Sequence, residues 1–475
     1  MPKTRFVLSA VLVLGALVGV HCAGDDEAPV DAGVPDVTLP GADAGRDANV
    51  ADTTVPDAGR DAAEDATVAD AGADAPVEAA ADAASDAPVD APADAALDAA
   101  AVFAPLTGVS NWEAFDLRTL ATTPSGLEGA LFDGRYVYYV PYGSGSTTPS
   151  GLTVRYDTQG AFTSASSWEE FDLFAQLGAR GYTGAIYDGR YVMYLPTNNN
   201  GTMTRVVRYD TQASFTAPAS WESYDLTNGA GQFVGAAFDG RYIYAAPYNT
   251  NVVARFDTTM ALSAGWTYYD LSYVRAPLGF SAPSFDGQYV YFTPLQPGAK
   301  LVRYDTKAAF LAAASWVSVD LAAQDVHATG FQSSSFDGRR ITFVPSNDPT
   351  GTTLRYDTTQ PLDGGPYERF AISSLLDGGA VSYCGSQFDG KYLYFAPLTS
   401  PFARLDTTMA MDAAGAWSLF DAVDAGLLGD AGVAKFCGGA FDGEYVYFSP
   451  FGQPIALRFH AKTPRSLPPR LGSFL

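Results

Sequence analysis

Hydrophobic and polar positions alternate in a pattern that repeats along most of the chain. In one copy, the small-residue run Gly184–Tyr187 leads into Asp-Gly, and the alternating run Arg190–Leu195 then stops at a proline. A third run ends in Arg-Tyr-Asp-Thr (Arg208–Thr211), and a fourth begins at a tryptophan and ends in Asp-Leu (Trp221–Leu226). Alternation with a period of two is typical of half-buried strands. Each copy therefore predicts four β-strands in succession.

The string aromatic-Asp-Gly marks the boundary between the first two strands and occurs seven times, at intervals of 47 to 55 residues. Its copies begin at Phe132, Tyr187, Phe238, Phe285, Phe336, Phe388 and Phe441. Asp-Gly between two strands predicts a type I′ hairpin turn, in which both central residues have positive φ. The proline after each second strand cannot donate to a ladder and ends it.

The two ends of the repeat region complement each other. The run Trp112–Leu117 resembles a fourth strand but precedes the first Asp-Gly, whereas the last unit, Cys437–Phe459, contains only three strands. Four strands per unit of about 50 residues match propeller blades better than solenoid repeats. We therefore predict an all-β fold, a seven-bladed β-propeller over residues 102–475, whose N-terminal strand closes the last blade and removes the open edges.

The repeat resembles the broad family of kelch-like and WD-like seven-bladed propellers in architecture. It has neither the Gly-His and Trp-Asp signature of WD repeats nor the double glycine of kelch repeats. It is more similar to propellers of bacterial surface lipoproteins built from aromatic-Asp-Gly-Arg-Tyr and Arg-Tyr-Asp-Thr strings. The resemblance covers residues 112–460 and implies the fold, but it implies no chemistry.

The N-terminal residues predict export. Lys3 and Arg5 precede the apolar run Phe6–Val20, which is too short for a comfortable transmembrane helix and is typical of a signal peptide over residues 1–21. Cys22 follows at once and resembles a lipobox cysteine, although the preceding leucine is absent and His21 replaces a small residue. We expect lipidation of Cys22 and anchoring at the outer membrane or cell surface of a Gram-negative bacterium; the alternative is ordinary cleavage and a free secreted protein.

Residues 22–101 consist mainly of Ala, Asp, Pro, Val and Gly. From residue 24 to 101 this stretch holds 20 of the 53 acidic residues but only 2 of the 28 basic ones, and so accounts for most of the formal net charge of −25. It lacks the apolar surface needed to offset its ordering entropy, so we predict a disordered, extended tether. The rest of the chain is also acidic, and this argues against a nucleic-acid partner.

Two cysteines occupy equivalent positions in neighbouring repeats. Cys384 and Cys437 each lie four residues before the hairpin aromatic, on innermost strands that should converge near the axis. In an oxidising compartment this predicts a disulfide, provided that the Cα atoms come within about 7 Å. The alternative is a pair of buried thiols. A metal ion at these two cysteines would lack a third protein ligand. We therefore predict no metal and no cofactor.

An aromatic column opens the innermost strands, five residues before the hairpin aromatic. Its members after Leu127 are Tyr182, Phe233, Phe280, Phe331, Tyr383 and Phe436. These side chains either pack between blades or form an aromatic rim for a sugar or a peptide at the mouth of the axial channel.

Variable loops lead into these strands, and recognition concentrates on loops carried by rigid frames. Their ionisable residues form no triad, zinc motif or carboxylate pair. We therefore favour a monomeric, non-catalytic binding or scaffold lipoprotein for a glycan or protein ligand. The alternative is a polysaccharide hydrolase or lyase that uses channel-mouth groups such as Glu128, Asp325 and His327.

Overall fold

The computed structural model describes residues 101–468. The exceptions are residues 125, 144–148, 198–203, 228–230, 277–278, 297, 324, 347, 377, 379–380 and 430–433. The predicted signal peptide, Cys22 and the tether lie outside the described residues. No helix within the described part of the chain has the length and apolar character needed to cross a membrane.

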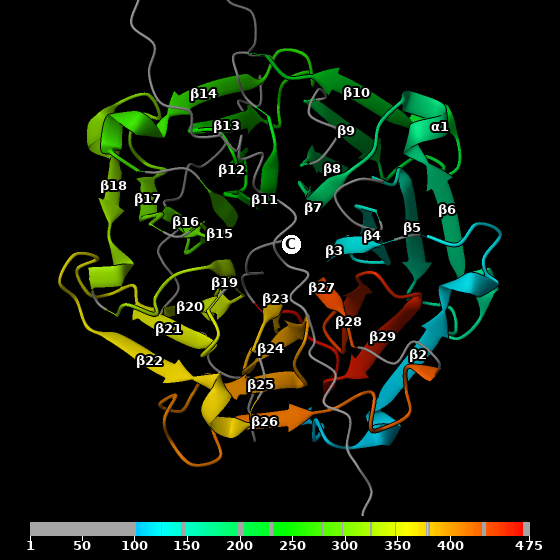
Figure 1. The fold of residues 1–475 in the computed structure, drawn as a ribbon. Coiled ribbons are helices and arrows are strands. Elements are labelled where there is room, and N and C mark those ends of the chain that lie inside the picture. Colours follow the sequence, from blue (N-terminus) through cyan, green and yellow to red (C-terminus); the bar gives the residue numbers. More distant parts are fainter. Residues whose placement is uncertain are drawn as a thin grey trace, which may run out of the picture. The chain divides into compact units, whose positions relative to one another are not determined.

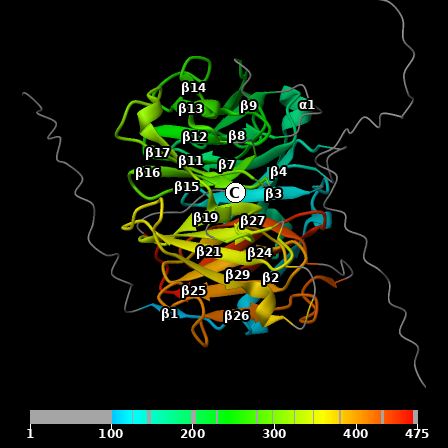
Figure 2. The same ribbon diagram turned by 60° about the vertical axis from the view of Figure 1, so that its left-hand side comes forward.

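The described residues form a β-propeller, in which antiparallel sheets are arranged around one axis (Figure 1). The first strand of each unit lies nearest the axis and the fourth lies outermost, as the turned view also shows (Figure 2). Five sheets have four strands each. The eight-stranded sheet consists of two four-stranded units that meet at a parallel bridge between Ala282 and Ser333.

The strands of the first four units, from the axis outward, are β3 (Leu127–Phe132), β4 (Tyr136–Pro141), β5 (Leu152–Asp157), β6 (Trp168–Asp172); β7 (Tyr182–Tyr187), β8 (Tyr191–Pro196), β9 (Arg205–Asp210), β10 (Trp221–Asp225); β11 (Phe233–Phe238), β12 (Tyr242–Pro247), β13 (Val252–Asp257), β14 (Trp266–Asp270); β15 (Phe280–Phe285), β16 (Tyr289–Pro294), β17 (Leu301–Asp305) and β18 (Trp316–Val319). The remaining units are β19 (Phe331–Phe336), β20 (Arg340–Pro345), β21 (Thr352–Asp357), β22 (Tyr367–Ala371); β23 (Tyr383–Phe388), β24 (Tyr392–Pro397), β25 (Phe402–Asp406), β26 (Trp417–Phe420); and β27 (Phe436–Phe441), β28 (Tyr445–Pro450), β29 (Ile455–His460), β2 (Trp112–Asp116). The other elements are β1 (Val102–Phe103), β30 (Lys462–Thr463), α1 (Leu173–Leu177), η1 (Val109–Asn111), η2 (Leu117–Thr119), η3 (Ala165–Ser167), η4 (Pro218–Ser220), η5 (Leu271–Val274), η6 (Ala313–Ser315), η7 (Leu321–Ala323) and η8 (Ile372–Leu375).

The N-terminal strand closes the ring, as the split repeat predicts. β2 pairs antiparallel with β29, with Trp112 opposite Phe459, and completes the sheet of β27 and β28 (Figure 1). Trp112 also stacks on Phe420 of the preceding sheet, with ring centroids 4.7 Å apart. On the other side, Phe115 stacks on Trp168 of the next sheet at 4.6 Å. The closing strand is therefore packed against both neighbouring sheets.

The same stack between outermost strands recurs around the ring. Trp221 stacks on Phe171 at 4.5 Å, and Trp316 stacks on Tyr269 at 4.4 Å. Each tryptophan also donates its indole N–H to a backbone carbonyl, as Trp316 does to Phe310 O at 2.8 Å. A buried indole with a satisfied N–H supplies a large apolar area with little polar cost. The tryptophan column therefore holds neighbouring sheets together.

The hairpin turns differ from the predicted type I′ turn. The Asp133 N–H donates to Tyr136 O, so Gly134 and Arg135 are the central residues rather than Asp133 and Gly134. Gly134 has a φ of 108°, but neither Asp133 nor Arg135 has positive φ. The type I′ prediction is wrong because the aspartate has another role: its Oδ1 accepts the Arg135 and Tyr136 N–H groups, and its Oδ2 accepts the Tyr138 hydroxyl.

Candidate functional site

Three polar side chains meet at the axis of the propeller. Glu128, Cys384 and Cys437 are the second residues of β3, β23 and β27, respectively. A carboxylate oxygen of Glu128 and the two sulfur atoms all lie within 4.8 Å of one another. Because these residues hold equivalent positions on innermost strands, the repeat itself directs the three side chains to one place.

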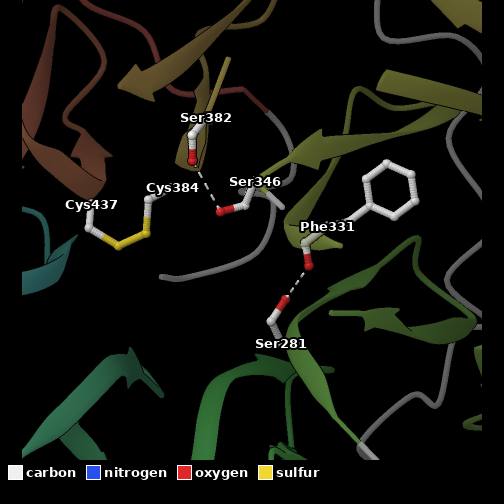
Figure 3. Close-up of a disulfide and its surroundings, with 6 residues drawn as sticks. All are labelled: Ser281, Phe331, Ser346, Ser382, Cys384 and Cys437. Atoms are coloured by element: carbon white, nitrogen blue, oxygen red, sulfur yellow. Dashed lines mark hydrogen bonds between the residues drawn. A yellow bond between two sulfur atoms is a disulfide. The ribbon is translucent and has the colours of Figure 1, made fainter. Parts of the chain in front are cut away.

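The predicted disulfide between Cys384 and Cys437 is present (Figure 3). The two Cα atoms are 4.5 Å apart, and 53 residues separate the cysteines in the sequence. The glycines that follow them allow this approach. A Cβ atom added to Gly385, whose φ is 90°, would lie 2.7 Å from the Cα atom of Gly438. The backbones of β23 and β27 therefore approach more closely than side chains at these positions would permit.

Removing this disulfide is expected to destabilise the protein. The Cys384→Ala/Cys437→Ala variant should lose about 2–4 kcal/mol of unfolding free energy, because the bond closes a long loop in the unfolded chain. Urea unfolding of residues 101–475 checks this value. Reduced wild-type protein is the matched control and should unfold near the variant's midpoint. Two reactive thiols in oxidised, denatured wild-type protein would show that the bond does not form.

Glu128 is a buried carboxyl group with unusual surroundings. Its side chain is 8% exposed, and within the described ranges no hydrogen bond or ion pair reaches its carboxyl group. Burial raises the pKa of Glu128 to about 8. Burying an ionised carboxylate without a partner is costly, so the group takes up a proton instead. At neutral pH Glu128 is therefore a mostly protonated acid beside a disulfide.

Apolar and aromatic side chains pack with the two cysteines of the disulfide, and we call them, together with Glu128 and the disulfide, the axial cluster. Val234, Ala282 and Leu398 are buried in it, and Tyr248 and Phe451 pack against it half-buried. Tyr248 accepts a hydrogen bond from the Gln296 side-chain amide at 3.4 Å. Burial raises the pKa of Tyr248, the Gln296 hydrogen bond lowers it, and the nearby Glu128 charge raises it. The Glu128 carboxyl group is thus close enough for its charge to affect the pKa of Tyr248.

Leu398, Tyr248 and Phe451 share one sequence position, directly after the proline that ends the second strand. The remaining residues at this position are Tyr142, Thr197, Leu295 and Ser346. The rings of Tyr142 and Phe451 are 6.0 Å apart. Sequence reasoning missed this column, although the strand-ending prolines mark it. It also missed that Glu128 lies four residues before its hairpin aromatic, as the two cysteines do.

Hydroxyl groups near the disulfide connect neighbouring units. The Ser281 hydroxyl donates to Phe331 O at 3.0 Å, which joins β15 to β19 (Figure 3). The Ser346 and Ser382 hydroxyl oxygens are 3.4 Å apart (Figure 3). These contacts satisfy buried polar groups and link neighbouring units of the propeller.

The aromatic column predicted as an alternative rim is buried. Its six side chains have no exposed surface. They are those of Tyr182, Phe233, Phe280, Phe331, Tyr383 and Phe436. Phe331 lies 5.3 Å from the ring of Phe343, and the Tyr182 hydroxyl donates to Arg205 O at 3.0 Å. The rim interpretation is therefore wrong: these side chains point between the sheets, where large rings fill the space, and they offer no surface to a ligand.

Asp325 and His327 are engaged with other partners. Asp325 forms an ion pair with Arg369 and accepts the His327 N–H at 2.8 Å. Burial acts to raise the pKa of Asp325, but the hydrogen bonds from His327 N–H and Arg369 outweigh it and lower the pKa. The His327 Nδ1 lies 3.2 Å from an oxygen of buried Asp348. In the described part of the chain, no hydrogen bond or ion pair joins either residue to Glu128.

No protein-family model and no curated protein matches the chain. Several solved structures resemble it. A streptogramin B lyase structure has 15% identity and a TM-score of 0.50, covering 74% of this chain and 97% of that one. YCF48 bound to D1 peptide has 12% identity, a TM-score of 0.48 and coverage of 74% and 97%. PorZ, a surface component of the type-IX secretion system of Porphyromonas gingivalis, has 13% identity, a TM-score of 0.44 and coverage of 75% and 39%. At such low identity, the likeness to the lyase structure shows the β-propeller fold and nothing of the chemistry.

Proposed function

We propose that this chain is an exported envelope lipoprotein that presents its propeller as a non-catalytic binding or scaffold module for a protein or glycan ligand. In this proposal residues 1–21 direct export, Cys22 carries the lipid anchor, and residues 22–101 act as a spacer. The propeller, which we place at residues 102–475, then stands away from the outer membrane or cell surface as a monomer.

Exposed apolar side chains on one face carry the proposal. Phe174, Tyr273 and Val326 are 48%, 74% and 78% exposed, respectively. Each lies on a segment that joins the outermost strand of one unit to the innermost strand of the next. Because all such segments leave their strands in the same direction, they lie on the same face of the ring. Apolar side chains exposed on loops of a rigid frame are typical of recognition surfaces.

A triple substitution tests this proposal. Phe174→Ala/Tyr273→Ala/Val326→Ala should weaken capture of the envelope ligand at least tenfold, because exposed apolar anchors dominate binding energy. Ligand capture is measured with immobilised propeller against envelope protein fractions and a glycan array. The variant should fold with the stability of the wild type, since surface substitutions usually change it by less than about 0.5 kcal/mol.

The opposite face supplies a matched control. Met260 and Leu311 are 47% and 65% exposed and lie on segments that join third to fourth strands. Met260→Ala/Leu311→Ala should leave capture unchanged. Equal losses in both variants would contradict a loop-face site. Release of soluble sugar products from a polysaccharide would instead identify the hydrolase or lyase alternative.

A further inference from the structure

We infer that the axial cluster binds an organic ammonium group, with the Glu128 carboxylate as its counter-ion. The inference depends neither on the envelope location nor on the loop-face ligand proposed above. It rests on the Glu128 side chain, which is more than nine-tenths buried and has no hydrogen-bonding or ionic partner in the described part of the chain. An unpaired buried carboxyl group destabilises a fold, and a cationic ligand would supply the missing partner.

The chemistry of the neighbours favours an organic cation over a metal ion. The two sulfur atoms near Glu128 are joined in a disulfide and therefore offer no thiolate. A calcium ion takes six to eight oxygen ligands, whereas Glu128 is the one carboxylate in the axial cluster as described. An ammonium group needs only one carboxylate and can take aromatic faces for its remaining contacts.

Aromatic rings pack against the axial cluster. Tyr248 and Phe451 are the two, and both residues are half-buried. The buried ring of Tyr142 lies beside Phe451, with the ring centroids 6.0 Å apart. Cations are attracted to ring faces, most strongly in desolvated sites. A buried carboxyl group without a partner, with aromatic rings packed nearby, offers the two kinds of contact that an alkylammonium group uses.

Binding must be linked to a proton. Since burial raises the pKa of Glu128 to about 8, an ammonium ion that binds below this pH displaces the carboxyl proton into solution. The titratable neighbour in the axial cluster is Tyr248, whose pKa is also raised, so it stays neutral over this range. The apparent affinity should therefore rise about tenfold per pH unit up to pH 8 and level off above it.

Calorimetric titration of the full chain with butylammonium chloride tests the inference, with sodium chloride at equal ionic strength as the blank. We expect saturable binding at pH 9 and affinity at least fivefold weaker at pH 7, where the heat should show release of about one proton through its dependence on buffer ionisation. Glu128→Gln should lose at least tenfold in affinity and all proton release. The exposed carboxylate variant Asp412→Asn should match the wild type.

A second variant keeps the test independent of how Glu128→Gln folds. Phe451→Leu retains an apolar side chain but removes a ring, and should weaken butylammonium binding severalfold. Unchanged affinity in both variants, or no saturable binding at pH 9, would overturn the inference, as would calcium or zinc binding that depends on Glu128 without ammonium binding. A blocked tripeptide with one central lysine identifies the source: tighter binding than butylammonium indicates a lysine side chain, and weaker binding indicates a small amine.

Discussion

Replacing Trp112 by alanine is expected to lower the free energy of unfolding by about 3–5 kcal/mol, the range for truncating a large buried ring. Trp112 is 5% exposed, stacks on Phe420 and donates its indole N–H to Leu106 O at 2.9 Å. It lies on β2, the strand that joins the N-terminal end of the propeller to β29. Loss of this ring weakens the closure as well as the local packing. Guanidinium unfolding of residues 101–475 measures the change.

Two other aromatic residues make this result interpretable. Tyr273→Ala removes a ring that is 74% exposed and should change the unfolding free energy by less than about 0.5 kcal/mol. Trp316→Ala removes an indole that stacks in the same way on a neighbouring sheet, with its centroid 4.4 Å from that of Tyr269. This substitution should lower the unfolding free energy as much as Trp112→Ala does. A cost below about 1 kcal/mol for Trp112→Ala alone would show that β2 contributes little to holding the ring closed.

The closure could be predicted because it depends on the order of the repeats alone. The repeat region begins with an unpaired fourth strand and ends with a unit that lacks one. Pairing these two ends closes a circular fold. The turn type was harder to predict because it depends on competition for hydrogen bonds. The side chain of Asp133 accepts two backbone N–H groups, which moves the central residues of the turn one position along the chain.

The repeat places residues in columns, but it does not show which face of a strand points to the axis. Glu128, Cys384 and Cys437 lie at irregularities in strand register, between Leu127 and Ala130, between Tyr383 and Ser386, and between Phe436 and Gly439, so regular alternation along the strand does not predict their directions. The cysteine column points to the axis, so Cys384 and Cys437 meet. The aromatic column packs between the sheets, where Phe233 and Phe331 are fully buried. Aligning Glu128 with the cysteines would have placed it at the axis from the sequence alone.

The unfolding free energy should fall as pH rises from about 4.5 to 8, because of Glu128. Its pKa is about 8 in the folded protein and has its ordinary value of 4.5 in the unfolded chain. Between these values the folded state keeps a proton that the unfolded state has released, so raising the pH favours unfolding. At about 1.36 kcal/mol per unit of pKa difference, the loss approaches 5 kcal/mol and is complete above pH 8. Urea unfolding at intervals of one pH unit measures the slope.

The Glu128→Gln variant separates this effect from the other acidic groups. Glutamine has the shape of the protonated acid but does not titrate, so the difference in unfolding free energy between variant and wild type should grow with pH and reach its plateau near pH 8. Asp412→Asn, at an exposed site, should follow the wild-type curve. Buffers must contain no organic amine, since a bound ammonium ion would stabilise the ionised folded state and flatten the slope. Parallel curves for wild type and Glu128→Gln would show that the Glu128 carboxyl group ionises freely in the folded protein, and that solvent or an unidentified partner reaches it at the axis.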